Sequence, residues 1–318
     1  MSIRKNMERI EGMLVKNLLA TRLGKSELRN PTILNSGYLG VNSDALIRAA
    51  KMGAGAVTSK SCGQKPRKGH PNPTVLQFGD VIMNAVGLSN PGADEEVPEI
   101  LRAVQGAGVP VIASIFAESA EGYVEVAGKI SKARPAFIEL NMSCPNVQLE
   151  MGIPFACDSR SAAQIVEMVK DTVKTPIIAK LSPNVPDIAS IAKSVEEAGA
   201  DAINAINTVG PGMVIDVEAK KPVLANKVGG ISGPAVRPIA VRCVWEISRA
   251  VEIPVIGTGG ILTGRDAVEM FMAGASAVGI GSALHYRGNE SFKLICSEIE
   301  EFMKKNGYSK LGELRLEE

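Results

Sequence analysis

The chain has 318 residues, of which 45% are apolar and 22% charged, so it can bury a large core. Its 35 basic and 34 acidic residues nearly balance, and no long block of one charge occurs, which argues against nucleic acid or an anionic membrane as the partner. The five cysteines form no CxxC pair, and no run reaches the roughly 18 apolar residues of a membrane span, so we expect a cytoplasmic protein without disulfides.

Short apolar runs alternate with amphipathic segments of helical length along most of the chain. This alternation predicts parallel strands joined by crossover helices, and eight strand–helix pairs close a (β/α)8 TIM barrel. We expect a single domain over residues 1–318, with residues 1–31 plugging the end of the barrel opposite the active site. The eight predicted strands are Thr32–Asn35, Gly55–Lys60, Val109–Phe116, Ala136–Asn141, Pro176–Leu181, Ala202–Asn207, Pro254–Gly257 and Ala277–Gly281.

Helical periodicity is clear between several of these runs. It predicts helices at Ser161–Val173, Asp187–Ala198, Pro234–Val251 and Gly264–Ala273, the last capped by Gly274. Three connections, Ser61–Gly108, Met142–Arg160 and Thr208–Gly233, are too long for plain loops. Long loops after barrel strands form the C-terminal face, where active sites of this fold lie, so we expect them to build the walls and lid of the site.

Glycine-rich segments follow the last two predicted strands, at Gly257–Ile261 and Gly279–Ala283, and a third lies at Gly229–Pro234. Glycines let backbone N–H groups approach an anion, and barrels often bind phosphate after strands seven and eight. Tight turns alone would explain one such segment. Three together predict a bound phosphate group.

Asparagines recur at or near predicted strand ends, at Asn35, Asn84, Asn141, Asn146 and Asn207, the last followed by Thr208. A single asparagine there is usually a turn or capping residue. Several at one end of a barrel suggest a planar ligand with C=O and N–H groups on several edges, such as a pyrimidine.

Lys60 and Lys180 end predicted buried strands, and lysine is rarely buried without a partner. The partner is either a flavin or substrate carboxylate, or a structural acidic neighbour such as Glu139. Cys144 lies in the 142–160 loop between Ser143 and Pro145. A lone cysteine is usually an inert core residue, but neither histidine, His70 or His285, is placed to activate it as a nucleophile, so a general base is its more natural role.

These motifs together resemble those of the class 1 dihydroorotate dehydrogenases, from about residue 23 to residue 287. The matching segments are Thr58–Ser61, Asn84–Leu88, Asn141–Asn146, Lys180–Pro183, Asn207–Thr208, Gly229–Gly233 and Gly257–Ile261. The resemblance implies one FMN per chain and oxidation of (S)-dihydroorotate to orotate in pyrimidine biosynthesis. Cys144 would remove the C5 proton while the C6 hydride passes to flavin N5.

The resemblance also implies the binding residues. Those for substrate are Lys60, Asn84, Ala85, Val86, Gly87, Leu88, Asn141, Asn146, Asn207 and Thr208. Those for FMN are Ser36, Lys60, Ser61, Ser114, Asn141, Lys180, Ile206, Gly233, Gly259, Gly260, Gly281 and Ser282. Ser114 stands where the family commonly places a flavin-contacting asparagine, which puts that contact in question. No metal site is expected.

The segment Phe155–Asp158 resembles the NAD-linked subclass, class 1B, more than the fumarate-linked one. This implies a homodimer, or a heterotetramer with a separate flavoprotein subunit that carries FAD and an iron–sulfur cluster. Two rival functions stay open: a dihydropyrimidine dehydrogenase-like enzyme acting on dihydrouracil, and a flavin-free barrel that binds a phosphorylated metabolite.

Overall fold

The computed structural model describes residues 17–142 and 158–317. Its centre is a closed barrel of parallel strands in the spatial order β10-β15-β16-β3-β4-β7-β8-β9, which confirms the predicted (β/α)8 fold. The barrel strands are β3 (Thr32–Leu34), β4 (Ala56–Thr58), β7 (Val111–Ile115), β8 (Phe137–Asn141), β9 (Ile177–Lys180), β10 (Ala202–Ala205), β15 (Val255–Thr258) and β16 (Ala277–Ile280). Seven of them lie within the predicted runs, and β15 extends one residue beyond its run, to Thr258.

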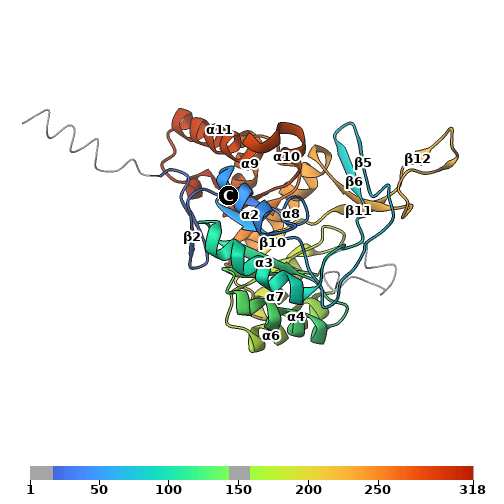
Figure 1. Cartoon of the computed structure of the whole chain (residues 1–318). Helices are drawn as coiled ribbons and strands as arrows, with labels where there is room; N and C mark the ends of the chain where they lie inside the picture. The colour runs from blue at the N-terminus through green and yellow to red at the C-terminus, as the bar shows by residue number, and fades with distance from the viewer. Residues whose placement is uncertain (1–16, 143–157, 318) are drawn as a thin grey trace, which may run out of the picture.

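Helices connect and cover these strands (Figure 1). They are α2 (Ser43–Lys51), α3 (Ala93–Gly106), α4 (Ala120–Ile130), α6 (Ser159–Thr172), α7 (Ile188–Glu197), α8 (Arg237–Ala250), α9 (Gly264–Met272), α10 (Ser282–Arg287) and α11 (Ser291–Asn306). The helix predicted from Pro234 begins as α8 at Arg237, because residues 234–236 form a separate 3-10 turn. Thr263 and Asp266 start α9 with a reciprocal capping box, and Gly274 follows that helix at a φ of 104°.

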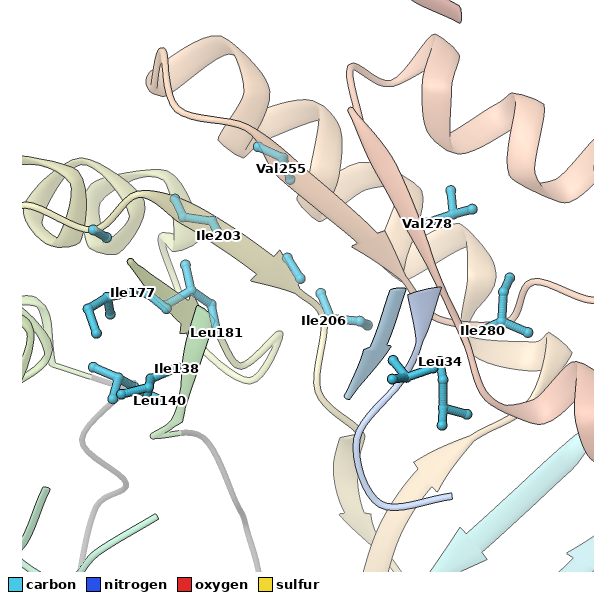
Figure 2. Close-up of a cluster of buried hydrophobic side chains, with 14 of the residues drawn as sticks. Leu34, Ile138, Leu140, Ile177, Leu181, Ile203, Ile206, Val255, Val278 and Ile280 are labelled. Atoms are coloured by element: carbon cyan, nitrogen blue, oxygen red, sulfur yellow. The ribbon is translucent and has the colours of Figure 1, made fainter. Parts of the chain in front are cut away.

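Side chains alternate between the two faces of the barrel wall. One face packs against the helices, as Leu140, Ile177, Leu181 and Ile203 do in the large cluster of Figure 2. The other face points into the barrel. Its lowest layer takes one apolar residue from each strand: Ile33, Ala56, Ile112, Phe137, Ile178, Ala202, Ile256 and Ala277. This layer is an apolar floor beneath the strand ends.

The floor is closed from below by a short hairpin of β1 (Thr21–Leu23) and β2 (Ser26–Leu28). Leu23 and Leu28 are buried in the same cluster as the floor residues. This hairpin is the described part of the expected N-terminal plug. Within the described ranges no helix combines the length and the apolar content needed to cross a lipid bilayer.

Two of the long connections fold into a second sheet, with the order β11-β14-β6-β5. Its strands are β5 (Val75–Phe78), β6 (Val81–Asn84), β11 (Val209–Gly212) and β14 (Gly229–Ser232), and β12 (Ile215–Asp216) pairs with β13 (Lys221–Pro222) beside it. Figure 1 shows β5, β6, β11 and β12 grouped on one side of the barrel. The sequence predicted walls here but not a sheet.

Candidate active site

A cavity of about 310 Å³ lies between the C-terminal ends of the barrel strands and the second sheet. Most of the predicted site residues line it: Ser36, Lys60, Ser61, Asn84, Val86, Gly87, Leu88, Asn141, Lys180, Ile206, Asn207, Thr208, Gly233, Gly259, Gly260, Gly281 and Ser282. Ala85 and Ser114 are fully buried behind the lining. Cys144 and Asn146 lie outside the described residues, as does most of the 142–160 loop.

The amide groups meet at this cavity from separate strands. Nδ2 of Asn207 donates to Oδ1 of Asn141 at 3.1 Å, and Nδ2 of Asn141 donates to Oγ of Ser61 at 3.0 Å. Asn84, at the end of β6, lines the cavity from the second sheet. The amides therefore surround one space, as a planar ligand with several polar edges requires.

Lys180 lies at the bottom of the cavity with only 4% of its side chain exposed. Its Nζ is 3.6 Å from Oε1 of Glu139, which is 1% exposed, and 3.5 Å from Oδ1 of Asn35. The structural interpretation of this lysine, an ion pair with Glu139, is therefore confirmed, and because Lys180 also lines the cavity its contact with a flavin or a substrate stays a prediction.

Lys60 follows β4 and is about half-buried. Burial lowers the pKa of Lys60, while the nearby carboxyl of Glu96 on α3 opposes that shift. Glu96 itself is buried, and burial raises its pKa to about 7, with repulsion from Glu99 in the same direction and attraction to Lys60 against it. The buried acid Glu96 thus lies near Lys60 in the wall of the cavity, and the sequence analysis did not single out Glu96.

The glycine-rich segments lie together along one wall, where Gly233, Gly259, Gly260, Gly279 and Gly281 line the cavity. Gly259 and Gly260 have φ angles of 132° and 73°, a region that favours glycine. A Cβ added to Gly279 would overlap Oγ1 of Thr258, so the protein itself requires glycine there. At Gly281 the nearest atom of the described residues, its chain neighbours aside, is 4.0 Å from such a Cβ, on Asn35, so no described side chain fills the space beside this glycine.

Ser114 has no exposed surface and reaches the cavity only through Ser61, whose Oγ is 2.8 Å from its own. Its hydroxyl donates to Oε1 of Glu139 at 3.0 Å. The position that the family resemblance assigned to a flavin contact therefore holds a buried linking group in this chain.

Several lining residues lie outside every glycine-rich or family-matching segment that the sequence analysis singled out: Gly37, Tyr38, Val75, Ile82 and Val236. Val75, Ile82 and Ile231 come from the second sheet. A signal for this sheet was present, because Gly79 and Asp80 separate two apolar runs as a two-residue hairpin turn does.

The family model for dihydroorotate dehydrogenase matches residues 18–303, which is most of the chain and includes all the walls of this cavity. The chain belongs to the dihydroorotate dehydrogenase family. The resemblance inferred from the motifs is therefore confirmed.

Relatives of this family from several archaea match along nearly their whole length. A protein of Methanothermobacter thermautotrophicus is 44% identical over 297 residues, covering 93% of this chain and 97% of the relative. A protein of Methanocaldococcus jannaschii is 45% identical, and the match covers 90% of this chain and 94% of the relative. A protein of Pyrococcus horikoshii is 42% identical, and the match covers 95% of this chain and 98% of the relative. Each is named dihydroorotate dehydrogenase B (NAD(+)), catalytic subunit, which supports the NAD-linked subclass.

Proposed function

We propose that this protein is an oxidoreductase that converts (S)-dihydroorotate to orotate in pyrimidine biosynthesis. The observation that carries the proposal is family membership over residues 18–303, joined to a cavity whose walls bear amides, lysines and glycine-rich loops. Amides from three directions suit the ring C=O and N–H groups of a dihydropyrimidine, and a half-buried lysine, Lys60, suits its carboxylate.

FMN fits the residues on the glycine-rich side. The free space beside Gly281, with Gly259 and Gly260 next to it, suits a phosphate approached by backbone N–H groups. Ser36, Ser61, Lys180, Ile206, Gly233 and Ser282 would hold the remainder of the group. When bound, FMN supplies the hydride acceptor. Lys180 would supply a cation that stabilises a reduced, anionic flavin.

Cys144 is the proposed general base, and it takes the proton from C5 of dihydroorotate as the hydride leaves C6. Lys60, Asn84, Asn141, Asn146, Asn207 and Thr208 would orient the ring, with Ala85–Leu88 forming its loop. These roles rest on the family motifs. A Cys144→Ala variant is expected to keep its flavin and to lose reduction by dihydroorotate by roughly 10²–10⁴-fold. Near-normal anaerobic reduction of that variant would exclude Cys144 as the base.

The rival substrate within this chemistry is dihydrouracil, which lacks the carboxylate. Anaerobic titration of the oxidised flavoprotein with each compound separates the two. Bleaching of the flavin by dihydroorotate is expected, and bleaching by dihydrouracil alone would refute the proposed substrate. A protein that refuses FMN on reconstitution would instead support the flavin-free, metabolite-binding alternative.

A partner subunit is the second part of the proposal. The relatives are named catalytic subunits, which supports an additional electron-transfer chain. We propose a flavoprotein with FAD and an iron–sulfur cluster, joined to a homodimer of this chain as a heterotetramer. Purification from the native source tests this, because recovery of the catalytic chain alone with full NAD-linked activity would contradict it. The cytoplasmic location stays a prediction.

A further inference from the structure

A layer of polar side chains fills the barrel directly above the apolar floor. Two residues along each strand from the floor positions, the interior holds seven polar residues, Asn35, Thr58, Ser114, Glu139, Lys180, Asn204 and Thr258, with Gly279 at the eighth position. Glu139 is the only acid among these eight positions, and it is 1% exposed. Polar groups at this depth are costly unless their partners are matched, so the pattern of donors and acceptors is informative.

The carboxylate of Glu139 fixes the direction of the hydrogen bonds that lead to the cavity. Because a carboxylate only accepts, Ser114 gives its hydroxyl proton to Oε1 of Glu139 at 3.0 Å. The contact of 2.8 Å between Ser114 and Ser61 must then be donated by Ser61. With its proton committed, Ser61 accepts from the side chain of Asn141 at 3.0 Å, so the Asn141 group facing it must be Nδ2.

The orientation of Asn207 is coupled to that of Asn141 and is also held by a backbone donor. With Nδ2 directed at Ser61, Oδ1 of Asn141 accepts from Nδ2 of Asn207 at 3.1 Å. Oδ1 of Asn207 then accepts from the backbone N–H of Thr208 at 2.7 Å. Either amide could be rotated by 180° with little change in shape, but rotation would set donor against donor in this chain.

The carboxylate is itself held from two other sides. Nδ2 of Asn204 donates to Oε2 of Glu139 at 2.7 Å, and Thr258 donates to Oδ1 of Asn204 at 2.7 Å. The ammonium group of Lys180 lies 3.6 Å from Oε1. Glu139 therefore has a fixed position from which a one-way chain of bonds can run.

We propose that Glu139 is a positioning residue that fixes the amide orientations of Asn141 and Asn207 through Ser114 and Ser61. It does not line the cavity, and it acts by deciding which edge of each amide a ligand meets. The consequence for substrate recognition rests on the proposed function, whereas the amide orientation itself does not.

The test compares Ser114→Ala, which interrupts the chain, Glu139→Gln, which leaves one accepting oxygen for the two donors Ser114 and Asn204, and the double variant. Ser59→Ala is the matched control, because Ser59 is also fully buried and its hydroxyl contacts the backbone N–H of Ser114 at 3.1 Å without belonging to the chain. Two measurements are made: the affinity of the FMN-loaded protein for orotate, followed by the flavin spectrum, and the side-chain amide resonances in protein labelled with ¹⁵N-asparagine. The amide signals are assigned with Asn141→Asp and Asn207→Asp.

Each single variant is expected to weaken orotate binding by about tenfold. The double variant should bind orotate no less tightly than the single variant with the larger loss, since both substitutions act on one chain of hydrogen bonds. Both singles should shift the amide signals of Asn141 and Asn207, whereas Ser59→Ala should leave them in place and change orotate affinity less than about twofold. Losses that multiply in the double variant, or a Ser59→Ala effect equal to that of Ser114→Ala, would overturn the proposal. Absence of orotate binding by the wild-type protein would refute the proposed substrate. The side-chain amide resonances of Asn141 and Asn207 would still test the positioning role of Glu139.

Discussion

Replacing Gly281 by alanine tests whether glycine is required there for FMN binding or for the stability of the fold. Among the residues that the structure describes, none beyond its chain neighbours would lie closer than 4.0 Å to the added methyl group, and the φ of Gly281 is −134°, outside the left-handed region. The free energy of unfolding should therefore change by less than about 1 kcal/mol. The same methyl group would occupy the space assigned to the flavin phosphate.

The expected loss of affinity follows from the contacts displaced there. A hydrogen bond to a charged group contributes about 1.5–3 kcal/mol, and each 1.4 kcal/mol is about tenfold in affinity. Gly281→Ala should accordingly weaken FMN binding by roughly 10- to 100-fold. Quenching of flavin fluorescence on titration with flavin-free protein gives the affinity, and urea unfolding of that protein gives the stability.

Gly279→Ala is the control variant, and for this variant the stability of the protein is expected to fall. Its methyl group would overlap Oγ1 of Thr258 and lie 3.1 Å from Cβ of that residue, which predicts a loss of about 1–3 kcal/mol in stability. Gly281→Ala protein with unchanged FMN affinity would refute the assignment of this wall to the phosphate. An equal loss of stability in both variants would show that Gly281 is required by the fold.

Two further substitutions test the buried charges. Lys180→Met leaves Glu139 without its cation, so the free energy of unfolding, measured by urea titration, should fall by about 3–5 kcal/mol. Adding Glu139→Gln should recover part of that loss, while the midpoint potential of the flavin stays lower than in the parent. An unchanged potential would contradict the role of Lys180. Because burial raises the pKa of Glu96 to about 7 from an ordinary 4.5, the folded state keeps a proton that the unfolded state releases, and the stability linked to this group is lost as the pH rises from 4.5 to 7. The free energy of unfolding of Glu96→Gln should therefore rise relative to that of the parent across this pH range, and exceed it by roughly 3 kcal/mol at pH 8. A stability difference that does not vary with pH would refute the raised pKa of Glu96.

The barrel was predictable because its signals are local. Each strand is a short apolar run beside a helix with its own caps, such as Thr263 and Gly274, so eight repeats could be recognised without knowledge of contacts. The glycine loops and the asparagines were recognisable for the same reason. Their position at strand ends gives their location once the fold is known.

Apart from the turn between β5 and β6, which has a local signal, the second sheet and the polar layer could not be predicted in the same way. The pairing of β6 with β14 joins segments almost 150 residues apart, so no local pattern specifies it. Glu139 and Asn204 look like isolated polar residues in apolar strands, and their meaning depends on a 2.7 Å contact across the barrel. Ser114 likewise became interpretable only through its neighbours Ser61 and Glu139.

The two interior layers of the barrel should differ in how they accept mutation over evolutionary time. An apolar floor residue such as Ile178 can be exchanged if a neighbour such as Ile112 compensates in volume, so substitutions there accumulate in small, reversible steps. In the layer above, exchange of a polar side chain leaves a donor, an acceptor or a charge without its partner, and a change at one neighbour restores only part of the loss. We therefore expect the polar side chains of that layer to change less often than the floor residues, and to change together with their hydrogen-bond partners.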